Sequence, residues 1–158
     1  MSQVEARLQA LGHSVPDVAK PAANYVPFVV VGNLIYVSGQ IPMKEGKLPF
    51  LGKVGDGVEV ETAQQAAQLC GLNIIGAVKG AIGNLDAVTQ VVKLGGFVNS
   101  TPDFANQPEV INGASDLMVA AFGAEVGAHA RAAVSAGALP RNVTVEVDAV
   151  VAFDPAKV

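Results

Sequence analysis

The 158-residue sequence has few charged residues, and this shortage bears on how its surface is covered. Charged residues make up 15% of the chain, whereas about one quarter is typical of a soluble domain. Hydrophobic residues make up 51%, so an ordinary monomer would have too few charges for its surface. Burial in a subunit interface accommodates such a composition, because obligate interfaces resemble a protein core cut in half. Composition therefore predicts an oligomer.

Cysteine and long apolar runs are also nearly absent. Cys70 is the only cysteine, which excludes an intramolecular disulfide and fits a reducing compartment. The longest clean apolar run, residues 26–31, contains Pro27 and is far shorter than the roughly 20 residues of a membrane-spanning helix. Glu5 and Arg7 lie where a secretory signal would place its apolar stretch. We therefore expect a cytoplasmic protein that does not enter a membrane.

Basic residues and histidines are scarce as well. The net charge is −4, and the ten Lys and Arg residues include no run of three. This argues against nucleic-acid binding, because phosphate neutralisation supplies most of that affinity. His13 and His129 have no cysteine or paired carboxylate at ligand spacing, which argues against a zinc site. The glycines form no nucleotide-binding loop, and Ser38 lacks the setting of a serine hydrolase nucleophile.

Hydrophobic periodicity and turn residues predict one α+β domain over residues 1–158. Ser2 and Glu5 have capping-box spacing and begin a short helix, within an N-terminal helical arm over residues 1–21. The predicted strands are 25–31, 34–38, 87–99, 130–136 and 143–153, and the predicted helices are 60–80 and 108–123. Residues 39–57 are expected to be an irregular loop. The order is β-β-α-β-α-β-β, with two helices on one face of a mixed sheet.

The last predicted strand places two carboxylates on one face. Strict alternation sends Val145 and Val147 to one side and Glu146 and Asp148 to the other. Neighbouring carboxylates raise the pKa of one of them and can prepare an acid/base group. A solvated sheet face explains the same pattern equally well. The residues alone leave both interpretations open.

Arg131 is the second candidate, because it stands in the small, apolar stretch 130–134. Its planar guanidinium suits a substrate carboxylate. An ion pair with Glu146 or Asp148 that only stabilises the sheet is an equal alternative. Cys70 lies on the apolar stripe of the helix predicted over 60–80, which favours a core role over a nucleophilic one.

Two segments resemble the Rid/YjgF family. Residues 131–150, RAAVSAGALPRNVTVEVDAV, resemble its C-terminal signature of an arginine, a Leu-Pro turn and an acidic residue in the last strand. The separation of Arg131 from Glu146 is similar to that in the family. Residues 33–42, NLIYVSGQIP, resemble the N-terminal hairpin of the family. The resemblance covers most of residues 22–152.

This resemblance implies a chorismate-mutase-like fold in a homotrimer with clefts between its subunits. It also implies hydrolysis of reactive enamines and imines, such as 2-aminoacrylate, to 2-oxo acids and ammonia, with no metal or organic cofactor. Arg131 would hold the carboxylate of a small metabolite, and Glu146 would orient or activate the attacking water. Further positions that match the lining of the family's cleft are Tyr25, Ser38, Asn112 and the backbone of Gly39.

The chain departs from the short members of that family. It has the N-terminal arm, a longer loop between residues 42 and 60, and extra length between residues 104 and 131. These segments resemble a longer subgroup labelled "putative endoribonuclease". Ala133 also replaces a cysteine that is common in relatives. Two alternatives to a deaminase are therefore kept: a noncatalytic trimer that binds a small carboxylate, and a ribonuclease, against which the acidic balance weighs.

Overall fold

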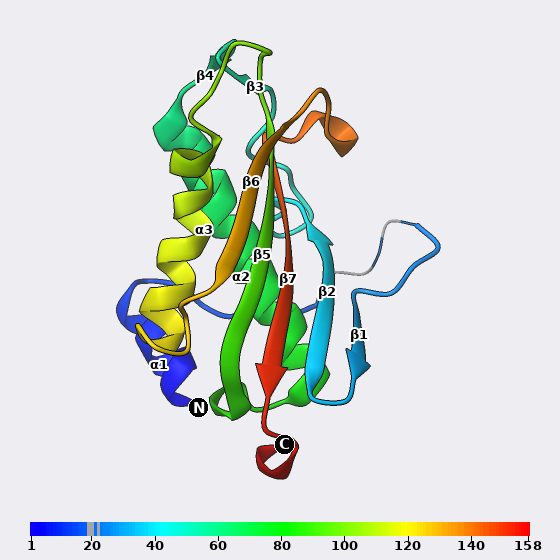
Figure 1. Ribbon diagram of the computed structural model, residues 1–158, viewed down its shortest axis with the longest axis vertical. Coiled ribbons are helices and arrows are strands. Elements are labelled where there is room, and N and C mark those ends of the chain that lie inside the picture. Colours follow the sequence, from blue (N-terminus) through cyan, green and yellow to red (C-terminus); the bar gives the residue numbers. More distant parts are fainter. Residues whose placement is uncertain (19–20, 22) are drawn as a thin grey trace.

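A five-stranded mixed sheet forms the centre of the computed structural model, which describes residues 1–18, 21 and 23–158 (Figure 1). The strand order is β1-β2-β7-β5-β6. The strands are β1 (Phe28–Val31), β2 (Leu34–Gln40), β5 (Val88–Asn99), β6 (Ala130–Ala136) and β7 (Val145–Phe153). Only the β5–β6 pair is parallel, whereas the other neighbours are antiparallel. The predicted α+β fold and its mixed sheet are confirmed.

Two long helices, α2 (Val60–Ile82) and α3 (Gln107–Phe122), cover one face of this sheet (Figure 1). They approach closely because Gly113 lies against the backbone of α2, where a Cβ would be 2.0 Å from the carbonyl oxygen of Gln64. Cys70 is fully buried between α2 and the sheet, and this burial raises the pKa of its thiol. Its predicted core role is confirmed. None of the described helices is long and apolar enough to cross a membrane.

The N-terminal arm begins with helix α1 (Gln3–Ala10), which is fastened at its N-terminal end. Ser2 and Glu5 form the predicted capping box, and the Asp86 carboxylate accepts a further bond of 2.9 Å from the Gln3 N–H. Beyond α1 the arm crosses α2, where Pro16 lies against the backbone of Gly76. Residues 19 and 20 of the predicted arm, and residue 22 just after it, lie outside the described residues.

The loop predicted over residues 39–57 differs from expectation, because part of it forms regular structure. Strands β3 (Lys53–Val54) and β4 (Gly57–Val58) make a small parallel pair. The loop also covers the beginning of the last strand, where Leu51 bridges to Val143 and Phe50 accepts a bond from the Thr144 N–H. For that reason β7 begins at Val145 rather than at residue 143. The first strand similarly begins at Phe28, three residues later than predicted.

The sheet face opposite the helices is open and apolar. Burial alternates along β7, so Val145 and Val147 face the helices while Glu146 and Asp148 face outward, as predicted. Large apolar side chains share this outer face, and Tyr36, Phe97 and Val134 are 48%, 36% and 47% exposed. We call this surface the open face.

Candidate active site

The sheet separates the two residues that were predicted to act together. Arg131 pairs in register with Leu94, which is fully buried beneath the helices, so Arg131 lies on the helix side at the β6 edge. Glu146 pairs with Phe97 on the open face. Residues that are paired across neighbouring strands point to the same face, so these registers place Arg131 and Glu146 on opposite faces of one subunit.

The ion pair considered for Arg131 is therefore not formed with Glu146 or Asp148. Arg131 Nη1 instead donates to Asn112 Oδ1 at 2.8 Å and to Ser115 Oγ at 3.1 Å, both on α3. The structure thus brings Arg131 together with Asn112. We call Arg131, Asn112, Ser115 and His129 the arginine group.

One edge of the Arg131 guanidinium remains available. Both bonds to α3 use Nη1, and no described residue accepts a hydrogen bond from Nε or Nη2. These two nitrogens form a parallel donor pair that matches the two oxygens of a carboxylate. The guanidinium can therefore bind a small carboxylic acid through Nε and Nη2 while Nη1 stays bonded to α3.

Glu146 and Asp148 occupy space on the open face that glycine backbones leave for them. A Cβ on Gly39 would lie 2.1 Å from Glu146 Oε1, and a Cβ on Gly95 would lie 2.3 Å from Asp148 Oδ1. Gly39 lies where the β2–β7 register shifts between Val37 and Gln40. We call Glu146, Asp148, Gly39 and Gly95 the carboxylate group.

The surroundings of Glu146 and Asp148 favour the protonated form of both carboxyl groups. Burial raises the pKa of Glu146, and the nearby charge of Asp148 raises it further. Burial also raises the pKa of Asp148, although the Gly95 backbone and Lys93 oppose that rise. A carboxyl group with a raised pKa is suited to accept and return a proton nearer to neutral pH.

Ser38 and Tyr25 lie toward the β1 edge of the same sheet. The Ser38 hydroxyl donates to the carbonyl oxygen of Val26 at 2.7 Å, and the Ser38 N–H donates to that of Pro27 at 3.0 Å. These bonds tie the end of β2 to the segment that carries Tyr25, whose side chain is 50% exposed. Ser38 and Gly39 are thus adjacent at the end of β2, which is bonded to the segment that follows Tyr25.

Sequence reasoning missed the roles of Ser115 and His129. His129 Nε2 lies 2.8 Å from Ser115 Oγ, and its Nδ1 lies 2.6 Å from the carbonyl oxygen of Gly127. One spacing carried a signal, because Asn112 and Ser115 are three apart on one helix and so lie on the same face. His129 precedes β6 and offered no such pattern. Across residues 1–18, 21 and 23–158, no group of three or more His, Cys, Asp and Glu side chains is arranged to hold a metal ion.

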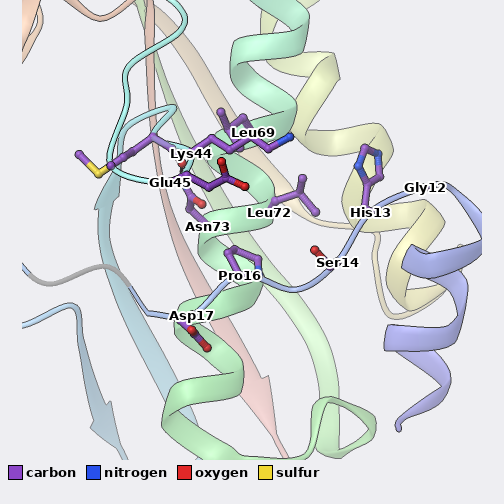
Figure 2. Close-up of a pocket in the computed structure, with 12 residues that line it drawn as sticks. Gly12, His13, Ser14, Pro16, Asp17, Lys44, Glu45, Leu69, Leu72 and Asn73 are labelled. Carbon is purple, nitrogen blue, oxygen red and sulfur yellow. Dashed lines mark hydrogen bonds between the residues drawn. The ribbon is translucent and has the colours of Figure 1, made fainter.

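A separate cavity of about 640 Å³ contains none of the predicted site residues. Figure 2 shows how the N-terminal arm, the turn at residues 43–46 and α2 surround it. Asn73 of α2 holds the turn, because its Nδ2 donates to the carbonyl oxygens of Ile41 and Met43 at 3.0 and 3.1 Å. The arm and the long loop, which both depart from the short family pattern, therefore meet at this cavity.

Comparisons with known proteins agree on one family. The model for "YjgF/chorismate mutase-like, putative endoribonuclease" matches residues 5–152. Protein TCP17 of Trypanosoma cruzi is 46% identical, over 94% of this chain and 93% of its own. A crystal structure of Atu1372, a protein of unknown function from Agrobacterium tumefaciens, is 50% identical, with a TM-score of 0.90 over 96% of this chain and 93% of that one. A putative endoribonuclease from Shewanella oneidensis MR-1 is 34% identical, with a TM-score of 0.91 over 95% and 99%.

Proposed function

Because the chain belongs to the YjgF/chorismate mutase-like, putative endoribonuclease family, we propose that it hydrolyses reactive enamines or imines of small carboxylic acids. The products are a 2-oxo acid and ammonia. The observation that carries this proposal is the Arg131 guanidinium, which is held at Nη1 and presents Nε and Nη2 to a ligand. A carboxylate of raised pKa, Glu146, supplies the proton chemistry.

The site is completed between subunits of a homotrimer. Arg131 and Glu146 lie on opposite faces of one sheet, so a ligand that meets both must lie between two copies of the chain. The apolar open face supports such an association, because Tyr36, Phe97 and Val134 are exposed there. Light scattering should therefore give the mass of three chains, and a stable monomer at micromolar concentration would contradict the proposal.

The reaction needs only positioning and one proton relay. Arg131 binds the carboxylate of a 2-imino acid and so fixes the adjacent C2 atom. Glu146 takes a proton from water as the water oxygen bonds to C2 of the protonated imine, which forms a carbinolamine. The protonated Glu146 then gives this proton to the amine nitrogen. The C2–N bond breaks, ammonia leaves, and Glu146 accepts the hydroxyl proton as the C2 carbonyl forms.

The test is hydrolysis of 2-aminoacrylate that is generated in situ, with wild type compared to Arg131→Ala and Arg131→Lys. Wild type should accelerate the reaction, and Arg131→Ala should lose the acceleration. Arg131→Lys keeps the charge but lacks the paired donors, so it should recover only part of the activity. Full activity in a folded Arg131→Ala trimer would rule out the proposed role.

Carboxylate binding without turnover is the second candidate. It is favoured by the arginine group itself, which is assembled within one subunit without Glu146. In that case 2-oxobutanoate should raise the melting temperature while 2-aminoacrylate decays at its uncatalysed rate. A ribonuclease activity, suggested by the name of the Shewanella relative, fits poorly with the net charge of −4.

A further inference from the structure

We propose that His129 and Ser115 form a hydrogen-bonded relay that positions Arg131 for its carboxylate ligand. The role of Arg131 in this statement rests on the proposed function, whereas the relay itself does not. Neither Ser115 nor His129 belongs to the residues that match the family's cleft. The relay runs from Gly127 through His129 and Ser115 to Arg131, and each of its contacts is between 2.6 and 3.1 Å.

The chemistry of the partners sets the direction of the two outer bonds in the relay, and the middle bond follows in the neutral imidazole. The carbonyl oxygen of Gly127 can only accept, so Nδ1 of His129 carries a hydrogen and donates to it. In the neutral imidazole Nε2 then has a free lone pair and accepts from the Ser115 hydroxyl. The hydroxyl hydrogen therefore points toward His129, and the lone pairs of Ser115 Oγ are left to accept from Arg131 Nη1.

The far end of the relay is anchored in the backbone. The turn that contains Gly127 is pressed against the end of α3, where a Cβ on Gly127 would lie 2.5 Å from the Met118 carbonyl oxygen. Gln90 Nε2 of β5 also donates to carbonyl oxygens within this turn, including those of Val126 and Ala128. His129 is thus fixed by a hydrogen bond to a closely packed turn. Through Ser115, this fixed ring restricts the orientation of the Arg131 side chain at the sheet edge.

Ordering the guanidinium in advance favours ligand binding. A free arginine side chain has many rotamers and loses conformational entropy when it is fixed. A side chain that is already held loses less on binding, which increases affinity without a new ligand contact. Ser115 and His129 are therefore positioning residues, and their effects should appear in ligand affinity and KM more than in the proton-transfer step.

The first readout requires no ligand or turnover. Nitrogen-15 NMR of the Arg131 guanidinium reports rotation about its Cζ–N bonds, which should be restricted in wild type and faster in Ser115→Ala. Ser115→Thr keeps the hydroxyl and should restore the restriction. Ser135→Ala is the matched control, because Ser135 is a β6 serine that bonds to Ser100 instead. Unchanged rotation in a folded Ser115→Ala protein overturns the inference, whatever the activity.

The second readout is the affinity for 2-oxobutanoate, measured by calorimetry. Ser115→Ala should weaken binding about tenfold, because a hydrogen bond to a charged group is lost. His129→Phe should weaken it less, and the double variant should match Ser115→Ala alone, since His129 acts through Ser115. Additive losses would overturn the relay. A wild type that neither binds 2-oxobutanoate nor hydrolyses 2-aminoacrylate refutes the proposed function, while the NMR result still decides the relay.

Discussion

Acidic side chains serve opposite purposes at two places in this molecule. At the N-terminal helix, Glu5 accepts from the Ser2 N–H at 2.7 Å and pairs with Lys79 at 2.5 Å, and these partners lower its pKa to about 2. On the open face, burial and the charge of Asp148 raise the pKa of Glu146. A carboxylate thus has its pKa lowered where donors meet it, and raised where burial and another carboxylate meet it.

The two places respond to pH with opposite signs. The pKa of Glu5 is lower in the folded chain than its ordinary 4.5, so its stabilisation is present above pH 4.5 and is lost as the pH falls toward 2. The pKa of Glu146 is higher in the folded chain, so its contribution to stability is present below pH 4.5 and is lost as the pH rises through the folded value. Five substitutions test this contrast.

Glu146→Gln should have the largest effect. Loss of the proton acceptor should reduce imine hydrolysis by about 10² to 10⁴-fold, the usual contribution of a general base. The same substitution removes a charge that burial disfavours, so the melting temperature at pH 7 should hold or rise. Steady-state kinetics and thermal denaturation measure the two effects. A large loss of stability would show that Glu146 serves the fold instead.

Asp148→Asn provides the matched control within the carboxylate group. It removes the charge that raises the pKa of Glu146, so the acidic limb of the pH–rate profile should move to lower pH. Activity at neutral pH should largely remain. An unshifted profile would contradict the coupling of the two carboxylates.

Gly39→Ala should have the next largest effect. A Cβ at this position would lie 2.1 Å from Glu146 Oε1, so the carboxylate must move away. Misplacement of a catalytic group by about 1 Å can lower the rate by about 10²-fold, and we expect a decrease of about 10- to 100-fold. Gly137→Ala is the control, because a Cβ there meets no atom within 4 Å. Equal rates in the two variants would remove Gly39 from the site.

Ser2→Ala affects the N-terminal helix, and it should change stability without changing activity. It removes the hydrogen bond of 3.1 Å that the Glu5 N–H donates to Ser2 Oγ. Loss of a helix N-cap typically costs about 1 kcal/mol in the free energy of unfolding, which urea denaturation measures. Imine hydrolysis should be unchanged. A parallel loss of activity would mean that α1 also supports the site.

Glu5→Gln should have the smallest effect, because glutamine can keep the capping box and only the charge is lost. The ion pair with Lys79 is partly exposed, so about 0.5 kcal/mol is expected at pH 7. The difference from wild type should shrink as the pH falls from 4.5 toward 2, where Glu5 becomes protonated. A difference that stays constant over this range would show that the pKa of Glu5 is not lowered by folding.

Local signals in the sequence predicted much of the fold. Helix α2 begins at Val60 as predicted, and Gly83 ends it with a φ of 71° that favours glycine. Alternation along β7 correctly placed Glu146 and Asp148 on one face. Each of these features depends on residues within a few positions of one another, which is why periodicity and turn residues report them.

Features that depend on distant pairing could not be predicted in the same way. Alternation assigns faces within one strand, but whether Arg131 shares a face with Glu146 depends on the registers of β6 and β7 against β5. The start of β7 was wrong for a similar reason, because residues of the long loop bond to Val143 and Thr144. His129 and Ser115 lie 14 positions apart and meet only after α3 packs on β6.

The position of β7 in the sheet also determines when this chain can fold during its synthesis. Of the five strands in this sheet, β7 is synthesised last, yet it lies in the middle, between β2 and β5. Until Phe153 has emerged, the hairpin β1–β2 and the parallel pair β5–β6 are two unconnected half-sheets with unpaired inner edges. The nascent protein therefore gains its sheet in one late step, and a stop codon shortly before β7 would leave fragments that expose both edges to aggregation.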